Sequence, residues 1–299
     1  MTAAGKARRA GGVRRRPGLF AEGGVTAATA FRGDAGMLSG KAALVTGSSQ
    51  GIGLGVARAF AASGAKVVLT SEKPLSSCPE VQRILSDYEH TRYIPADLLQ
   101  EGEPERLLSE AWHAFTGLDI LVNNVGTYKE PPLEQLTRRD FDFIFGLNVW
   151  SAIALSREFV RRLKAEKRPG RILFSSSLNA SRSEPQHTLY DASKGAINAL
   201  CRQLAVELAP LGITTAAVAP GLVETPLTDF GLKSTPSERH AVMEQIPLRR
   251  IATVEDVAWW YVFLASDKAA YATGTIVVVD GGLDAQQMAF RPISPFEQG

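Results

Sequence analysis

The chain has 299 residues, of which 45% are hydrophobic and 21% are charged, and its formal net charge is +2. This composition is close to the globular average, which excludes a collagen, a coiled coil and a chain that is disordered throughout. No uninterrupted apolar run approaches the roughly 18 residues that a membrane-spanning helix needs. Two cysteines, Cys78 and Cys201, cannot form a disulfide framework in a chain of this length. We therefore expect a soluble, cytoplasmic protein with no membrane partner.

Residues 1–36 differ from the rest of the chain in their charge. They hold seven basic and two acidic side chains, a net charge of +5, whereas the remaining 263 residues carry a net charge of −3. Glycine, alanine and arginine dominate the segment without any apolar periodicity, which predicts a disordered basic extension. A targeting peptide, a basic arm and a start assigned too early, upstream of Met37, remain alternatives. Because the body of the chain is acidic, we expect no nucleic-acid partner.

From Lys41 onward, short apolar runs alternate with longer stretches of helical spacing. The predicted strands are Ala42–Val45, Val67–Thr70, Arg92–Pro95, Ile120–Val122, Arg171–Phe174, Ile213–Val218 and Thr275–Val279. The predicted helices are Ile52–Ala62, Glu103–Phe115, Arg139–Leu163, Ala192–Leu208 and Val254–Leu264. Strands that alternate with helices in this way form parallel sheets with right-handed crossovers. The pattern predicts one α/β domain over residues 37–283, a doubly wound Rossmann-type fold with a seven-stranded parallel sheet and helices on both faces.

Two segments depart from this alternation. Leu222–Arg250 is rich in threonine, proline and charged residues and has weak periodicity. An insertion of this length in a compact domain is usually functional, so we predict a lid over a pocket. Residues 284–299 follow the last predicted strand as a C-terminal arm. Their proline and phenylalanine content is compatible both with an ordered arm on a neighbouring subunit and with disorder.

A glycine-rich turn, Gly47-Ser-Ser-Gln-Gly51-Ile-Gly53, joins the first predicted strand to the first predicted helix. Glycines there allow backbone amides to approach a pyrophosphate at the positive end of the helix. A tight turn that binds nothing would use the same glycines. The letters also fit the G-x-S-x-G nucleophile elbow of a serine hydrolase, with Ser49 as the nucleophile. That elbow lies deep in a sheet after an oxyanion loop, whereas this turn follows the first strand, so its position favours nucleotide binding.

Tyr190 and Lys194 lie four residues apart, which places them on one face of a helix. A fixed ammonium group beside a phenol favours the phenolate and lowers its pKa from the ordinary value of about 10. Such a phenol can exchange a proton with an alcohol or a carbonyl compound. Taken alone, however, this spacing is common on solvated helix faces.

Further motifs accompany the pair in a fixed order. They are Thr46-Gly47-x3-Gly51-x-Gly53, Asn123-Asn124-Val125-Gly126, Ser177, Tyr190-x3-Lys194 and Pro220-Gly221. This order resembles the short-chain dehydrogenase/reductase family in its single-domain form of roughly 250 residues, and the resemblance covers residues 38–283. Val125 departs from the alanine that is usual in the family. The resemblance implies an NAD(P)-dependent oxidoreductase that interconverts a secondary alcohol and a ketone.

The resemblance also implies catalytic roles. Tyr190 would be the general acid/base, and Lys194 would lower its pKa and hold the nicotinamide ribose. Ser177, chosen among three consecutive serines by its spacing from Tyr190, would hydrogen-bond the substrate oxygen and stabilise the developing alkoxide. Asn148 would help to hold a water on the proton path to Lys194. We predict no metal site, because the histidines lack the spacing of metal ligands.

For the cofactor, the resemblance implies one set of contacts along the cleft. These are Gly47, Ser49, Gln50, Gly51, Ile52, Gly53, Glu72, Asp97, Leu98, Asn124, Gly126, Tyr190, Lys194, Pro220, Gly221, Val223 and Thr225. Asp97 would contact the adenine and Thr225 the nicotinamide carboxamide. Glu72 follows the second predicted strand, where an acidic group repels a 2′-phosphate, and Lys73 beside it weakens this preference. We therefore predict NAD rather than NADP.

The substrate is less well specified. Four polar residues, Asn179, Glu184, Gln186 and His187, surround the expected pocket and favour a small polyol or sugar-like alcohol, although His187 itself is expected in a surface loop. The alternative is an NADPH-dependent reductase of 3-oxoacyl thioesters on an acyl carrier protein. A more distant alternative is a non-catalytic nucleotide-binding protein on the same fold. The run 273–282 resembles the family's last strand, which implies a homotetramer or a homodimer.

Overall fold

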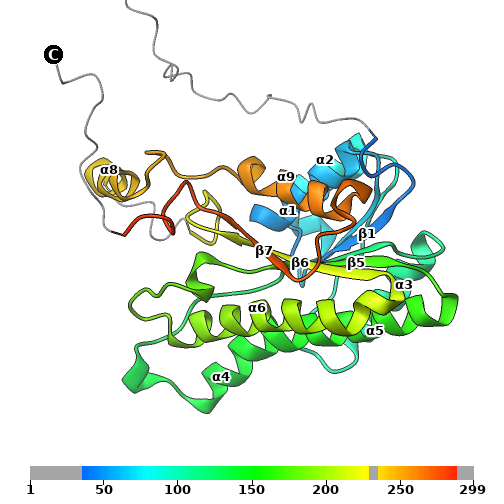
Figure 1. Ribbon diagram of the computed structural model, residues 1–299, viewed down its shortest axis with the longest axis horizontal. Helices are drawn as coiled ribbons and strands as arrows, with labels where there is room; N and C mark the ends of the chain where they lie inside the picture. Colours follow the sequence, from blue (N-terminus) through cyan, green and yellow to red (C-terminus); the bar gives the residue numbers. More distant parts are fainter. Residues whose placement is uncertain (1–35, 229–234, 288–299) are drawn as a thin grey trace, which may run out of the picture. The chain divides into compact units, whose positions relative to one another are not determined.

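The computed structural model describes residues 36–228 and 235–287. The disorder predicted for the basic segment and the last part of the C-terminal arm therefore lie outside the described residues. The strands form one parallel sheet in the order β3-β2-β1-β4-β5-β6-β7, so the predicted fold class is confirmed (Figure 1). The strands are β1 Ala42–Val45, β2 Lys66–Leu69, β3 Thr91–Tyr93, β4 Ile120–Asn123, β5 Gly170–Ser175, β6 Ile213–Pro220 and β7 Thr275–Val279.

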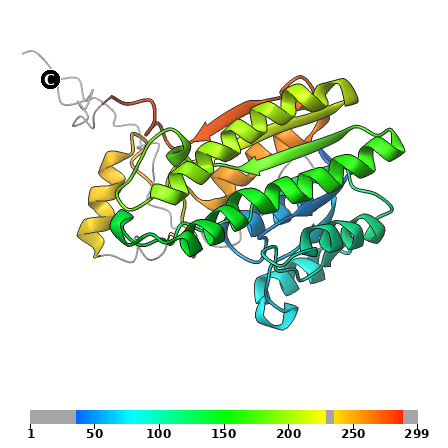
Figure 2. The same cartoon turned by 90° about the horizontal axis from the view of Figure 1, so that it is seen from below.

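Helices cover both faces of this sheet. They are α1 Gly51–Ala62, α2 Pro79–Asp87, α3 Glu103–Ala114, α4 Arg138–Phe145, α5 Ser151–Glu166, α6 Thr188–Leu208, α8 Pro236–Gln245 and α9 Val254–Ala265. Helices α1 and α9 pack together on one face, whereas α3, α5 and α6 cover the other (Figures 1 and 2). From β1 the strands follow one another outward to one edge of the sheet, and from β4 they follow one another outward to the other edge. In open α/β sheets, such a switch point between β1 and β4 opens a crevice at the carboxyl ends of the strands.

Two helices were not predicted from the sequence. Helix α2 spans nine residues, which is too short for a strong periodic signal. Helix α8 lies inside the segment that was predicted to be a lid, and most of its described side chains are exposed, so no apolar stripe marks it. A capping box defines its start, because the Thr235 side chain accepts from the Glu238 amide while the Glu238 carboxylate accepts from the Thr235 amide.

The long helix predicted over Arg139–Leu163 is interrupted. A π-helical turn, Gly146–Trp150, separates α4 from α5 and carries Asn148, and such turns are frequent at functional sites. By length and composition alone, the continuous stretch Arg138–Glu166 could cross a membrane, but half of the tested window is buried inside the protein. It packs against α3 and β4 and is therefore a core helix of this domain.

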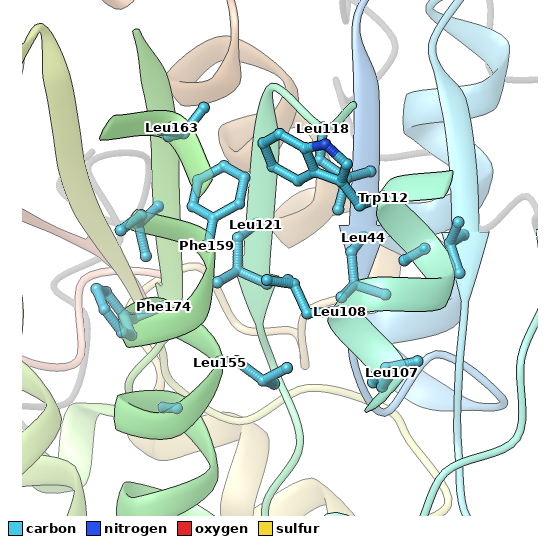
Figure 3. Packing of buried hydrophobic residues seen from close by; sticks show 14 of the residues in the cluster. Leu44, Leu107, Leu108, Trp112, Leu118, Leu121, Leu155, Phe159, Leu163 and Phe174 are labelled. Carbon is cyan, nitrogen blue, oxygen red and sulfur yellow. The ribbon is translucent and has the colours of Figure 1, made fainter. Parts of the chain in front are cut away.

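The core between the sheet and helices α3 and α5 is apolar (Figure 3). Trp112 of α3 and Phe159 of α5 meet edge to face, with ring centroids 6.2 Å apart. Leu44 and Leu121, from the adjacent central strands β1 and β4, are fully buried beneath these helices. This packing holds the carboxyl ends of the central strands in place, and the candidate site lies at those ends.

Candidate active site

A cleft of about 530 Å³ opens at the carboxyl ends of the strands. Most of the predicted cofactor contacts line it. They are Gly47, Ser49, Gln50, Gly51, Ile52, Gly53, Glu72, Asp97, Leu98, Asn124, Gly126, Tyr190, Lys194 and Thr225. Pro220, Gly221 and Val223 are not among the residues that line it. Pro220 pairs with β7, a Cβ on Gly221 would lie 2.8 Å from Asp280, and Val223 is buried.

The glycine turn brings the backbone close to the cleft. Gly47 has a φ of +60°, which side chains rarely adopt. A Cβ on Gly53 would lie 2.3 Å from the Gly47 carbonyl oxygen, so the first turn of α1 can approach the strand only with glycine there. The N-cap residue Gln50 makes no side-chain hydrogen bond to the amides of that turn. These amides are therefore suited to bind a phosphate group.

The Asn124 side chain joins the ends of three strands beneath the turn. Its Nδ2 donates to the carbonyls of Thr46 and Gly47, at 3.0 and 3.2 Å. Its Oδ1 accepts from the Ser175 hydroxyl at 2.8 Å. The Thr46 hydroxyl in turn accepts from the Asn124 backbone amide at 2.9 Å. The floor of the cleft is thus a hydrogen-bonded network with fixed geometry.

Tyr190 and Lys194 lie on one face of α6, close to its beginning. The Lys194 Nζ donates to the Ser175 carbonyl at 2.8 Å and lies 5.6 Å from the centre of the Tyr190 ring. Burial lowers the pKa of Lys194 to about 8. Burial also raises the pKa of Tyr190, and the nearby Ser177 hydroxyl opposes that effect only in part. The expectation of a lowered phenol pKa is therefore wrong for the protein without its cofactor.

The three consecutive serines have different partners. The Ser175 hydroxyl lies 2.6 Å from the Tyr261 hydroxyl, and the Ser176 hydroxyl donates to Asn198 at 2.6 Å. The Ser177 hydroxyl donates to the Asn179 Oδ1 at 3.3 Å and accepts from the Asn179 backbone amide at 3.1 Å, and it lies close enough to the Tyr190 phenol to lower its pKa. The structure therefore brings together Ser177 and Tyr190, the pair selected by spacing in the sequence.

Asn148 lies beneath the same group of side chains. Its Oδ1 accepts from the Thr127 amide at 2.8 Å, and its Nδ2 donates to the Thr127 carbonyl at 2.8 Å and to the Ser193 hydroxyl at 3.0 Å. Asn148 therefore holds the segment after β4 against α6. Its role in holding a water stays a prediction.

The lining of the cleft also includes Glu72, an exposed charged side chain that follows β2. Its neighbour Ser71 is buried and bonds to the Tyr93 hydroxyl at 2.7 Å. Tyr93 also donates to the Lys73 carbonyl at 2.6 Å, and burial raises its pKa to about 12. Tyr93 therefore anchors the backbone on both sides of Glu72, which leaves the Glu72 carboxylate to face the cleft.

Three side chains surround Tyr190, of which sequence reasoning missed Tyr128 and Glu130 and expected His187 in a surface loop. The rings of Tyr128 and His187 lie edge-on to the Tyr190 ring, with centroids 6.1 and 5.5 Å away. His187 is thus half-buried beside the phenol and is not simply a surface residue. The Glu130 carboxylate accepts hydrogen bonds from the amides of Leu189 and Tyr190. No local pattern marks these residues, because their partners lie far away in the sequence or depend on how a loop folds.

The Tyr128 hydroxyl also reaches the segment after β6, which lines the mouth of the cleft. It donates to the Leu227 carbonyl at 2.9 Å, and Leu227 itself lines the cleft. Part of the segment predicted as a lid therefore does border the cleft. Within the described residues, no cluster of histidine, cysteine and acidic side chains could hold a metal ion.

Comparisons with known proteins agree with this geometry. The family model adh_short_C2, described as enoyl-(acyl carrier protein) reductase, matches residues 47–284. A glucose 1-dehydrogenase of Gluconobacter oxydans is 36% identical over 247 residues, which cover 82% of this chain and 92% of the relative. A 3-oxoacyl-[acyl-carrier-protein] reductase of Rickettsia prowazekii is 34% identical over 248 residues, 82% of this chain and 98% of the relative.

One similar solved structure contains a nucleotide. It is described as a 2-deoxy-D-gluconate 3-dehydrogenase from Agrobacterium tumefaciens with bound NADP. Its TM-score is 0.76 at 31% sequence identity, and the match covers 83% of this chain and 98% of that chain. The described cleft therefore belongs to a fold that binds a nicotinamide dinucleotide in a relative.

Proposed function

Since the chain belongs to the short-chain dehydrogenase/reductase family and so acts on CH–OH groups, we propose that its substrate is a small polyol or sugar-like secondary alcohol. The observation that carries this proposal is the position of Tyr190, which lines the cleft close to Lys194 and near Ser177. The serine hydrolase alternative is dropped with the family assignment. An inert nucleotide-binding protein is disfavoured, because Ser177, Tyr190 and Lys194 are all present.

In the proposed oxidation, the Tyr190 phenolate takes the proton from the substrate hydroxyl, and the Ser177 hydroxyl donates a hydrogen bond to the substrate oxygen. The nicotinamide, when bound, accepts the hydride. Lys194 has a lowered pKa of about 8, so it is mostly protonated at neutral pH. Its positive charge beside the ring favours the phenolate, and its ammonium would hold the nicotinamide ribose.

Polar groups beside the phenol support a hydroxyl-rich substrate. The Asn179 amide nitrogen donates to Asp191 at 2.9 Å, and His187 pairs with Glu184 at 3.2 Å. Asn179 lies beside Ser177 and His187 lies beside Tyr190, so these donors and acceptors would suit additional hydroxyls on a substrate better than an alkyl chain. The glucose 1-dehydrogenase relative supports the same class.

A reductase of 3-oxoacyl thioesters is the second candidate. It is supported by the description of the matching family and by the Rickettsia relative. For the cofactor, Glu72 in the lining of the cleft supports NAD by repelling a 2′-phosphate. Exposed aromatic side chains along the α4–α5 stretch, Phe141, Phe143 and Trp150, support a homotetramer or a homodimer. A cytoplasmic location also stays a prediction.

One experiment separates the two candidates. NADH and NADPH are titrated into the full-length protein by fluorescence, and turnover is then measured with D-glucose and xylitol as alcohols and with acetoacetyl-coenzyme A as a thioester. We expect tighter binding of NADH and oxidation of at least one polyol. Reduction of the thioester with NADPH, without polyol oxidation, would support the second candidate. If neither nucleotide binds, the oxidoreductase proposal is wrong.

A further inference from the structure

Glu130 supplies a cap for helix α6 that the helix lacks in its own sequence. The N-cap residue His187 makes no side-chain hydrogen bond to the first-turn amides. Instead, Glu130 Oε2 accepts from the Leu189 amide at 2.8 Å, and Glu130 Oε1 accepts from the Tyr190 amide at 3.1 Å. A carboxylate at this position satisfies donors that a helix start leaves free, and it lies at the positive end of the helix dipole.

The segment that carries Glu130 also runs close to the lysine of the site. At its beginning, Asn148 holds the backbone of Thr127 with two hydrogen bonds of 2.8 Å. A Cβ on Gly126 would lie 3.5 Å from the Lys194 Nζ, so the segment runs close to the ammonium. The five residues from Gly126 to Glu130 therefore span the distance between the ammonium and the backbone of the phenol-bearing residue.

We infer that Glu130 is a positioning residue for the reaction, which holds the backbone of Tyr190 so that its phenol meets Ser177 at the cleft. This inference rests on the proposed function, because it assumes that Tyr190 transfers a proton. A carboxylate with two charge-assisted hydrogen bonds has a defined geometry. An isosteric amide can accept only one of the two, since its nitrogen is itself a donor.

The charge of Glu130 adds a second effect. Several titratable groups surround Tyr190, from α6, from the loop before it and from the segment after β4. They are Lys194, Asp191, Glu184, His187, Tyr128 and Glu130. A negative charge disfavours the phenolate, so replacing the Glu130 carboxylate by a neutral group lowers the pKa of Tyr190. The acid limb of the pH–rate profile for alcohol oxidation then moves to lower pH.

The test compares Glu130→Gln, Glu130→Asp and the matched control Glu134→Gln. Glu134 is exposed four residues further along, and among the described contacts it makes no hydrogen bond to α6. Oxidation of D-glucose and xylitol with NAD⁺ is followed against pH. NADH affinity is measured by fluorescence, and amide exchange of the peptide over residues 185–194 is measured by mass spectrometry.

For Glu130→Gln, we expect kcat to fall on the order of tenfold with NADH affinity unchanged, and the acid limb to move down by about half a pH unit. Amide exchange at the start of α6 is expected to accelerate on the order of tenfold. Glu130→Asp keeps the charge with a shorter reach, so its pH profile should match the wild type while its kcat is intermediate. Glu134→Gln should match the wild type throughout.

Each outcome decides the inference. Faster exchange with unchanged kcat and pH profile would show a purely structural cap and overturn the positioning role. Unchanged exchange in a folded Glu130→Gln protein would show that the cap does not form, which also overturns it. If Glu130→Gln fails to fold, Glu130→Asp decides by the same comparison. Absence of wild-type turnover with both alcohols would overturn the proposed substrate class alone, and the kcat comparison would then use acetoacetyl-coenzyme A with NADPH, because Tyr190 transfers the proton in both candidate reactions.

Discussion

The Lys194 ammonium lies 5.6 Å from the centre of the Tyr190 ring and is held there by its hydrogen bond to the Ser175 carbonyl. This bond joins the end of β5 to α6. Burial acts on both side chains in the same sense, since it raises the pKa of the phenol and lowers that of the ammonium to about 8. Burial thus shifts both groups toward their neutral forms, although Lys194 stays mostly protonated at neutral pH.

Replacement of the phenol tests its role directly. Tyr190→Phe removes the proton-transferring hydroxyl and leaves the ring packed against Tyr128 and His187. We expect kcat to fall by roughly 10²- to 10⁴-fold, with NADH affinity changed by less than about threefold because the cleft keeps its shape. Tyr271→Phe is the matched control, since the Tyr271 side chain is fully exposed. Full activity of Tyr190→Phe would contradict the proposed acid/base role.

Lys194 makes stability depend on pH. Its folded pKa of about 8 lies below the ordinary value of 10.5, so below pH 8 the fold bears the whole cost of a buried ammonium. Between about pH 8 and 10.5 the unfolded chain binds more protons than the folded one, so stability rises with pH. Lys194→Met lacks this rise. We therefore expect the free energy of unfolding of the wild type, relative to that of Lys194→Met, to increase by up to about 3 kcal/mol over this range.

Urea unfolding at several pH values measures this gain. Lys164→Met is the matched control, because Lys164 is exposed on α5 and its loss should leave the slope of stability against pH unchanged. A constant difference between wild type and Lys194→Met from neutral to alkaline pH would show that the folded pKa of Lys194 is not lowered.

The close approach at the glycine turn predicts opposite effects for one kind of substitution. In Gly53→Ala the added Cβ would lie 2.3 Å from the Gly47 carbonyl oxygen, so the turn must move. We expect a loss of about 1–3 kcal/mol in stability and weaker NADH binding. In Gly195→Ala the nearest atom lies 4.0 Å away, and the helix should gain about 0.5–1 kcal/mol. Thermal unfolding of both variants with and without NADH provides the comparison.

Glu72 controls the expected cofactor preference. Glu72→Arg replaces repulsion of a 2′-phosphate with attraction, and we expect the ratio of NADH to NADPH affinity to fall on the order of tenfold or more. Glu89→Arg introduces the same charge change at an exposed position that does not line the cleft, so it should leave the ratio near the wild-type value. Titration of both nucleotides measures it. Tighter NADPH binding by the wild type would refute the preference for NAD.

Some expectations failed for identifiable reasons. The predicted helix over Arg139–Leu163 is close in extent to the observed stretch Arg138–Glu166, but the π-helical turn inside it was not predicted. Helix α8 was missed because it buries little surface. In both cases the backbone is determined by hydrogen bonds or caps, which the pattern of apolar residues does not report.

The sequence by itself determined the parallel sheet, because strands buried on both faces read as continuous apolar runs. Through its resemblance to a known family, it also indicated most of the residues that line the cleft. Tertiary structure alone decided the surroundings of Tyr190. The Glu130 carboxylate, 60 residues away in the sequence, accepts a hydrogen bond from the Tyr190 backbone amide. His187 lies beside the Tyr190 ring because of how the loop before α6 folds. The pKa of the phenol depends on this burial and these contacts, and neither leaves a periodic signal in the sequence.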